Sequence, residues 1–191
     1  MKTLETLLSR LGSLCRSFKR NERGGVLIEF GFVAPVLLLV LVGSFETARY
    51  IYTSQKIQRT AMTLADLASR TKTIDQNDIN NLFAAAQEVA KPFELDGSSR
   101  IYISSVENDG NDNPVVGWQD NDGSLISISS VGIQGGAAVL PDNFLINNNQ
   151  SIIVAEVYFQ YRPVFVSIIG DRIISHRAMF RPRLSLTVKR E

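Results

Sequence analysis

The stretch "RGGVLIEFGFVAPVLLLVLVGSFE", residues 23–46, decides the fold of this chain. From Val26 to Phe45 the run is almost wholly apolar, and as a helix it would be about 30 Å long, the thickness of one hydrocarbon core. Pro35 would remove one helical hydrogen bond, which a membrane helix tolerates. Glu29 is a carboxylate within this run, where a charge is costly. The stretch therefore predicts a membrane span whose one acidic residue needs a purpose.

Charge divides the chain at the same place. Residues 1–24 hold six basic and two acidic residues, a balance of +4, and the remaining residues hold 14 basic and 17 acidic ones, a balance of −3. A basic segment before an apolar run keeps the N-terminus in the cytoplasm and sends the rest across the membrane. The net charge of +1 argues against a dedicated nucleic-acid binder. Cys15 is the only cysteine, which excludes an intramolecular disulfide and a thiolate metal cluster.

A cleaved secretory signal peptide is the alternative to a retained anchor. The residues after the run, Gly43 to Glu46, form a poor small-x-small cleavage site. Apolar residues also continue at helical spacing, at Tyr50, Ile57, Ala61, Leu64 and Ala68. The pattern predicts one continuous helix from about Val26 to about Arg70 and favours a retained anchor.

The rest of the chain predicts an α+β domain. Asp75 to Asp78 has the features of a helix start, and Pro92 closes the helix. Beyond it the apolar period changes to two, which is typical of strands. Four sets of apolar residues each share one face of an expected strand: Ile101 and Ile103; Ile126 and Ile128; Ile153, Ala155, Val157 and Phe159; and Leu184, Leu186 and Val188. Residues 108–113 and 120–123 are expected to be polar turns. We expect a mainly antiparallel sheet, with residues 46–91 helical and residues 100–190 mainly β.

The residues around Glu29 resemble the processing site of type IV pilin-like proteins. In that family a membrane-embedded peptidase cuts after a glycine, and a glutamate occupies the fifth mature position. The resemblance implies cleavage after Gly24, so that Gly25 becomes the N-terminus and Glu29 residue five. Independently of the family, a new α-amine at the membrane edge could pair with the carboxylate of a neighbouring subunit and offset part of the cost of both charges. An interfacial glutamate with no such partner is the alternative.

Over a longer stretch the chain resembles TadE-like minor pseudopilins of the tight-adherence (Tad, or Flp-type) pilus system. The resemblance rests on "GGVLIEFGFVAPVLLLVLVGSFE", which contains the acid-aromatic pair Glu29-Phe30, on "AAAQEVAKPFELDGSSRIYISSVE" with Gly117-Trp118-Gln119, and on "LPDNFLINNNQSIIVAEVYFQYRPVF". Phe30 stands where the major pilin of the family has tyrosine, which implies a minor subunit or priming component. The leader also has an amphipathic spacing of its own, at Leu4, Leu7, Leu8, Leu11 and Leu14, and could touch the membrane surface.

Two sharper interpretations have weaker support. Asp120 to Gly123 suggests a calcium loop, but an EF-hand register would put Trp118 first and Ser129 last, and neither supplies the oxygens required. A loop of another type stays open, with solvated turns favoured. His176 could join Asp171 and Ser175 in a catalytic triad, but closeness in sequence does not impose the necessary geometry. A structural role is favoured for His176, a core role for Trp118, and a solvated face for Arg162, Arg172, Arg177, Arg181 and Arg183.

The sequence therefore predicts three parts: a basic leader at 1–24, a transmembrane helix at 25–45, and a periplasmic pilin-like domain at 46–191. The expected protein sits in the bacterial inner membrane, is a substrate of a prepilin peptidase, and meets the major pilin, other pseudopilins and an inner-membrane platform protein. No catalysis and no cofactor are expected. The alternative function is an uncleaved, signal-anchored periplasmic enzyme or ligand-binding domain, and a pseudopilin of another secretion system is a third possibility.

Overall fold

The computed structural model describes residues 23–110, 113–141, 146–165 and 170–191. The leader with Cys15 lies almost wholly outside these residues. Two structural units meet between Phe45 and Glu46, within the helix α2, Arg23–Ala68. This helix confirms the expectation of one unbroken helix from the apolar run to about residue 70.

The first unit is the apolar part of α2. Its large side chains are exposed around the whole helix, among them Leu27, Phe32, Leu37 and Leu41. A helix that is apolar on every side belongs in a membrane or in the middle of a bundle. Among the described residues, α2 is the one helix long and apolar enough to cross a membrane.

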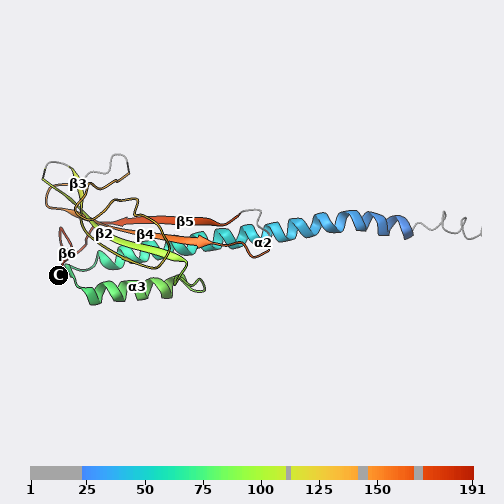
Figure 1. Ribbon diagram of the computed structural model, residues 1–191, viewed down its shortest axis with the longest axis horizontal. Coiled ribbons are helices and arrows are strands. Elements are labelled where there is room, and N and C mark those ends of the chain that lie inside the picture. Colours follow the sequence, from blue (N-terminus) through green and yellow to red (C-terminus); the bar gives the residue numbers. More distant parts are fainter. Residues whose placement is uncertain (1–22, 111–112, 142–145, 166–169) are drawn as a thin grey trace, which may run out of the picture. The chain divides into compact units, whose positions relative to one another are not determined.

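The second unit begins with a helical layer. From residue 46 onward α2 becomes amphipathic and buries one face, with Ile57, Ala61 and Leu64 fully covered. The helix α3, Gln76–Ala90, runs beside it, and Lys56 Nζ of α2 donates to the carbonyl of Val89 at 3.3 Å (Figure 1).

The predicted start of α3 is confirmed. The Asp75 side chain accepts from the Asp78 backbone N–H at 2.8 Å, and the Asp78 side chain accepts from the Asp75 backbone N–H at 3.2 Å. This capping box satisfies donors that the first turn of a helix would otherwise leave unpaired.

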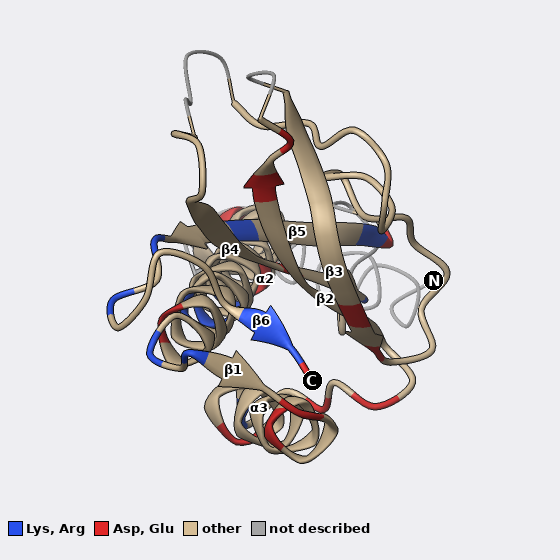
Figure 2. Ribbon diagram, turned by 90° about the vertical axis from the view of Figure 1, so that its left-hand side faces the viewer, with Lys and Arg blue, Asp and Glu red and all other residues tan. Residues whose placement is uncertain are grey.

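Four antiparallel strands form the sheet, in the order β3-β2-β4-β5. Their bounds are Ser99–Asn108 for β2, Pro114–Asp122 for β3, Ser151–Tyr161 for β4 and Arg172–Phe180 for β5. Two short strands, β1 at Thr73–Ile74 and β6 at Lys189–Arg190, pair in parallel next to α3 (Figure 2). The fold is therefore α+β with a mainly antiparallel sheet, as expected.

Each face of the sheet is covered by a different layer. On the inner face, Ile101, Ile103, Ile153, Ala155 and Val157 pack in one apolar cluster with α2 and α3. On the outer face, Val106, Val116, Ile152 and Val154 pack with Val131, Ala138 and Ile146 of the long connection between β3 and β4. Because β4 lies between two strands and two layers, nearly all of it is buried.

The expected strand around Ile126 and Ile128 is wrong. Their side chains are 92% and 80% exposed, whereas Ser129 of the same stretch is buried. At the end of this stretch Ser129, rather than either isoleucine, faces inward, because its hydroxyl donates to the buried carboxylate of Glu156 in β4.

The expected strand at residues 184–188 is also wrong. Leu184 and Leu186 are exposed, only Val188 is buried, and the strand β6 begins at Lys189. The Trp118 indole N–H holds this segment by donating to the Val188 carbonyl at 2.8 Å.

The predicted turn at residues 120–123 is largely a strand. Asp120, Asn121 and Asp122 end β3 and pair with Ile103, Tyr102 and Ile101 of β2. Gly123 follows with φ 94°, a conformation suited to glycine, and a Cβ there would lie 2.3 Å from the Ser99 carbonyl oxygen.

Candidate functional site

The residues predicted to mark processing and assembly lie in the first turns of α2. Gly24 and Gly25 are helical, and a Cβ added at either would meet nothing within 4 Å. Glu29 lies one helical turn beyond Gly25 and is exposed, between Ile28 and Phe30, which are exposed too. The geometry presents a single carboxylate on an otherwise apolar helix surface, where it can accept hydrogen bonds from a neighbouring molecule.

A second carboxylate, Glu46, begins the folded domain and is 2% exposed. The Tyr161 hydroxyl, at the end of β4, donates to Glu46 Oε1 at 2.5 Å. The backbone N–H groups of Val164 and Phe165 donate to Oε2 at 3.2 and 3.3 Å. Arg49, one turn along α2, lies 3.7 Å from Oε1 and 5.5 Å from the centre of the Tyr161 ring. Glu46 thus ties the chain after β4 to the first turn of the domain's helix.

The same contacts set the ionisation of this pair. The Tyr161 hydroxyl holds the pKa of Glu46 below its usual value, against the effect of burial, and the two backbone N–H groups and Arg49 act in the same direction. Burial, followed by the bond to Glu46, raises the pKa of Tyr161 to about 12. At neutral pH a carboxylate therefore faces a phenol that remains a donor.

A third carboxylate, Glu156, lies on the outer face of β4 and is 1% exposed. It accepts from the hydroxyls of Ser129 and Ser130, from the Ser130 N–H at 3.0 Å and from the Tyr158 hydroxyl at 3.0 Å. Burial is the main cause that raises the pKa of Tyr158, so this hydroxyl also remains a donor. Arg177, which pairs with Glu156 across β4 and β5, reaches the Ser130 hydroxyl at 3.5 Å.

A hollow of about 260 Å³ lies beside Glu156, lined by Ser130, Tyr158, Ser175 and Arg177 among others. The Glu156 carboxylate already accepts hydrogen bonds from donors of its own chain. We therefore assign Glu156 to holding the β3–β4 connection on the sheet rather than to chemistry.

The structure contradicts a triad of Asp171, Ser175 and His176. His176 points to the inner face of β5, where its Nε2 lies 2.8 Å from the Ser54 hydroxyl of α2. Ser175, its neighbour on the strand, points to the opposite face. Burial lowers the pKa of His176, in keeping with a structural residue.

Asp120 forms an ion pair with Arg190 and is not left as a ligand for a metal cation. Arg190 Nε lies 2.9 Å from its carboxylate and thereby joins the end of β3 to β6. Within the described residues, no group of three or more His, Cys, Asp or Glu side chains could hold a metal ion.

Two of these clusters were not predicted from the sequence. In the sequence Glu46 is notable only as the end of the poor cleavage site after the apolar run, and its partner Tyr161 is 115 residues away. The signal for Glu156 was stronger, because a glutamate inside the otherwise apolar run of β4 needs an internal partner.

The bare apolar helix and the sheet domain define the class of this protein: an α+β domain carried on a single helix with the features of a single-pass membrane anchor. Within that class, one stretch of the chain is similar to TadE-like proteins. Residues 24–66, the anchor and the first helix of the domain, match the family model described as TadE-like protein. This match supports an association of the chain with Tad pilus systems. No curated protein and no solved structure was found to match the chain.

Replacing Glu46 with glutamine tests the Glu46–Tyr161 pair. Glutamine keeps the shape but turns an amide N–H₂ toward groups that themselves donate, so the melting temperature of the detergent-solubilised protein should fall by about 5 °C at pH 7. Since the pKa of Glu46 is lowered in the folded state, its contribution is complete above the usual value of 4.5 and is lost as pH falls below it. The difference between wild type and variant should therefore shrink in acid.

The control is Glu94→Gln, which makes the same charge change at an exposed position. Tyr161→Phe should lower the melting temperature too, and the double variant should cost less than the sum of the two. Additive losses would contradict a direct Glu46–Tyr161 interaction.

Proposed function

We propose that this chain is a minor pseudopilin that a prepilin peptidase cuts after Gly24 and that takes part in assembling a Tad/Flp-type adhesion pilus. The observation that carries the proposal is the match of residues 24–66 to the TadE-like family, beginning at the glycine pair and including Glu29. The exposed apolar surface of α2 supports it, because such a surface needs lipid or other helices around it.

Removal of the leader would expose the α-amine of Gly25 one helical turn from Glu29. In a bundle of such helices, the carboxylate of one subunit can accept from the amine of the next. The pairing would offset part of the desolvation of both charges and fix the axial register between subunits. Glu29 is a site for assembly in this proposal, and Phe30 contributes to the surrounding apolar surface.

The proposed topology follows from charge. The basic leader stays in the cytoplasm of a bacterium, residues 25–45 span the inner membrane, and residues 46–191 form the periplasmic domain. The partners are the prepilin peptidase, the major pilin, other pseudopilins and an inner-membrane platform protein. No catalytic step is assigned to this chain.

The N-terminal residue of the membrane-extracted protein tests the proposal. In cells with an active prepilin peptidase, intact mass and terminal sequencing should give a chain that begins at Gly25. Gly24→Val should retain the leader, since the added side chain blocks the residue at the cleaved bond while leaving the helix undisturbed.

Gly43→Val is the matched control, because it places the same side chain in open space later in the same helix. Its leader should still be removed. A wild-type chain that keeps Met1 under these conditions would overturn the pseudopilin proposal.

A further inference from the structure

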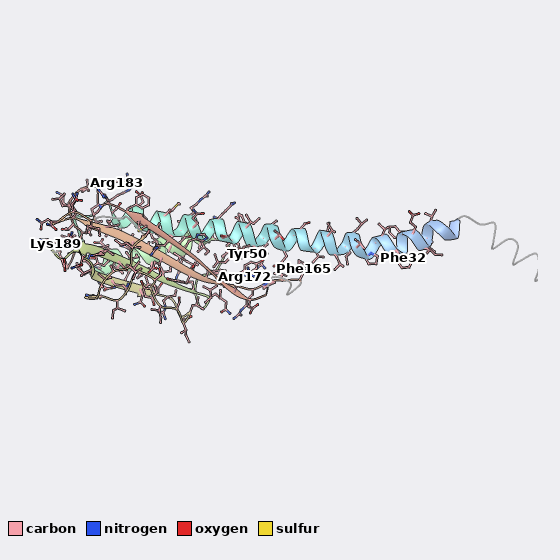
Figure 3. The ribbon with its side chains drawn as sticks, turned by 90° about the horizontal axis from the view of Figure 1, so that it is seen from above. Phe32, Tyr50, Phe165, Arg172, Arg183 and Lys189 are labelled. Atoms are coloured by element: carbon pink, nitrogen blue, oxygen red, sulfur yellow. The ribbon has the colours of Figure 1, made fainter. Side chains whose placement is uncertain are left out.

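The end of β4 and the start of β5 form a surface at one end of the domain. Val164 and Phe165 follow β4 and are 59% and 64% exposed, and Ile173 near the start of β5 is exposed as well. Figure 3 shows Phe165 and Arg172 near Tyr50, at the other end of the domain from Arg183 and Lys189. We call Arg49, Arg162, Val164, Phe165 and Arg172 the basal surface.

Hydrogen bonds fix the basal surface to the residue that follows the apolar run. The N–H groups of Val164 and Phe165 bind the carboxylate of Glu46, and Glu46 comes directly after Phe45 in the chain. Arg49 Nη1 also donates to the Arg162 carbonyl at 3.1 Å. These bonds hold Val164 and Phe165 within one side chain's length of position 46, the first residue after the apolar run.

The chemistry of the basal surface combines two features of membrane-contacting segments. Exposed apolar side chains gain by entering the boundary between headgroups and acyl chains. Arginines beside these side chains suit lipid phosphates, because the guanidinium can form bidentate hydrogen bonds with a phosphate group. Arg162 and Arg172 are both exposed. Arg172 also lies 5.7 Å from the centre of the Tyr50 ring, which places its charge beside a residue type common at membrane interfaces.

We propose that the basal surface rests on an anionic phospholipid bilayer, with Val164 and Phe165 inserted at the headgroup level and the arginines on the phosphates. This rests on the proposed membrane anchoring of residues 25–45. The contact gives the domain a second attachment besides its helix and thus limits its tilt before the subunit leaves the membrane. A face of another pilus subunit is the competing occupant.

The test uses the full chain in nanodiscs at one copy per disc, in a Cys15→Ser background. A single environment-sensitive fluorophore is attached at Phe165→Cys, and lipids carrying a quencher near the headgroup are added. We expect several-fold greater quenching at position 165 than at Leu186→Cys, which is 63% exposed and therefore closely matched. The Ser151 N–H donates to the Leu186 carbonyl, so this control lies at the far end of β4, about 30 Å away.

A label at Leu38→Cys separates the two proposals. Quenching at 38 without quenching at 165 would overturn the basal contact and leave the anchor standing. Absence of quenching at both positions would overturn both. A label at 165 that is shielded from water only when other pilus subunits are added would assign the surface to a protein partner and overturn the lipid contact.

Lipid charge tests the part assigned to the arginines. Quenching at 165 should be stronger in discs containing phosphatidylglycerol than in discs of phosphatidylcholine alone. Arg162→Gln should remove most of that difference, and Arg181→Gln, an exposed arginine after β5, should leave it unchanged. Equal quenching in both lipids would contradict recognition of anionic headgroups.

Discussion

Neutralising Glu29 should prevent incorporation of this subunit into pili while leaving it inserted and processed. Glu29→Gln keeps the length and most of the shape of the side chain, so α2 and the proposed cleavage after Gly24 should be unaffected. In the assembled bundle, however, the amine of Gly25 on the neighbouring subunit would lose its carboxylate. Removing one partner of a buried ion pair costs about 3–5 kcal/mol. Incorporation should therefore fall by about a hundredfold or more.

Quantification of this subunit in sheared pili, relative to the amount in the membrane, measures the effect. Glu29→Asp keeps the charge but shortens the side chain, and it should restore part of the incorporation. The control Glu88→Gln removes a charge that pairs with Lys91 on the exposed face of α3, where ion pairs contribute little. Normal incorporation of Glu29→Gln would show that Glu29 is an interfacial acid without an assembly role.

The helices were predictable because their signals are local. A run of about 20 mostly apolar residues defines the span, and Asp75 with Asp78 caps α3 through bonds three residues apart. The strands β2 and β4 were predictable for a related reason, since their inner faces alternate without interruption through Ile101, Ile103, Ile153 and Ala155. These patterns need no knowledge of what lies across the fold.

The edge strands lacked such a pattern. In β3, Pro114 and Gly117 interrupt the alternation, and Asp120 to Asp122 look like a turn although their backbone pairs with β2. In β5, the outer positions carry Ser175 and Arg177, and this stretch of the sequence indicates a solvated face rather than a strand. An edge strand needs fewer apolar residues because a neighbour covers only one of its sides.

The carboxylate sites show the limit of sequence reasoning more sharply. Glu29 could be singled out because its surroundings are set by neighbours in sequence. Glu46 and Tyr161 meet only because β4 places its last residue beside the first turn of the domain helix. The alternation of Ile126 and Ile128 predicts a strand, whereas both side chains are exposed and the nearby Ser129 is buried, where its hydroxyl donates to Glu156. A hydrogen bond between Ser129 and the distant Glu156 therefore decided which side chains are buried, against the local apolar pattern.

Replacing Glu156 should release the connection between β3 and β4 from the sheet. Its four hydrogen bonds come from donors, and glutamine at this position would turn two further donors toward some of them. With buried donors left unpaired, Glu156→Gln should lose about 3 kcal/mol of stability. For a chain of this size the melting temperature should then fall by about 6–12 °C.

Hydrogen exchange distinguishes release of this connection from general loss of stability. Amide exchange in Glu156→Gln should accelerate most at residues 129–139, which lie over Glu156, Tyr158 and Arg177. Protection of α3 should be retained, because its packing is on the opposite face of the sheet. Ser175→Ala, which removes a hydroxyl from the same hollow without touching Glu156, should change neither measurement appreciably. If exchange rises equally in α3 and in the connection, Glu156 supports the whole domain rather than holding one layer to the sheet.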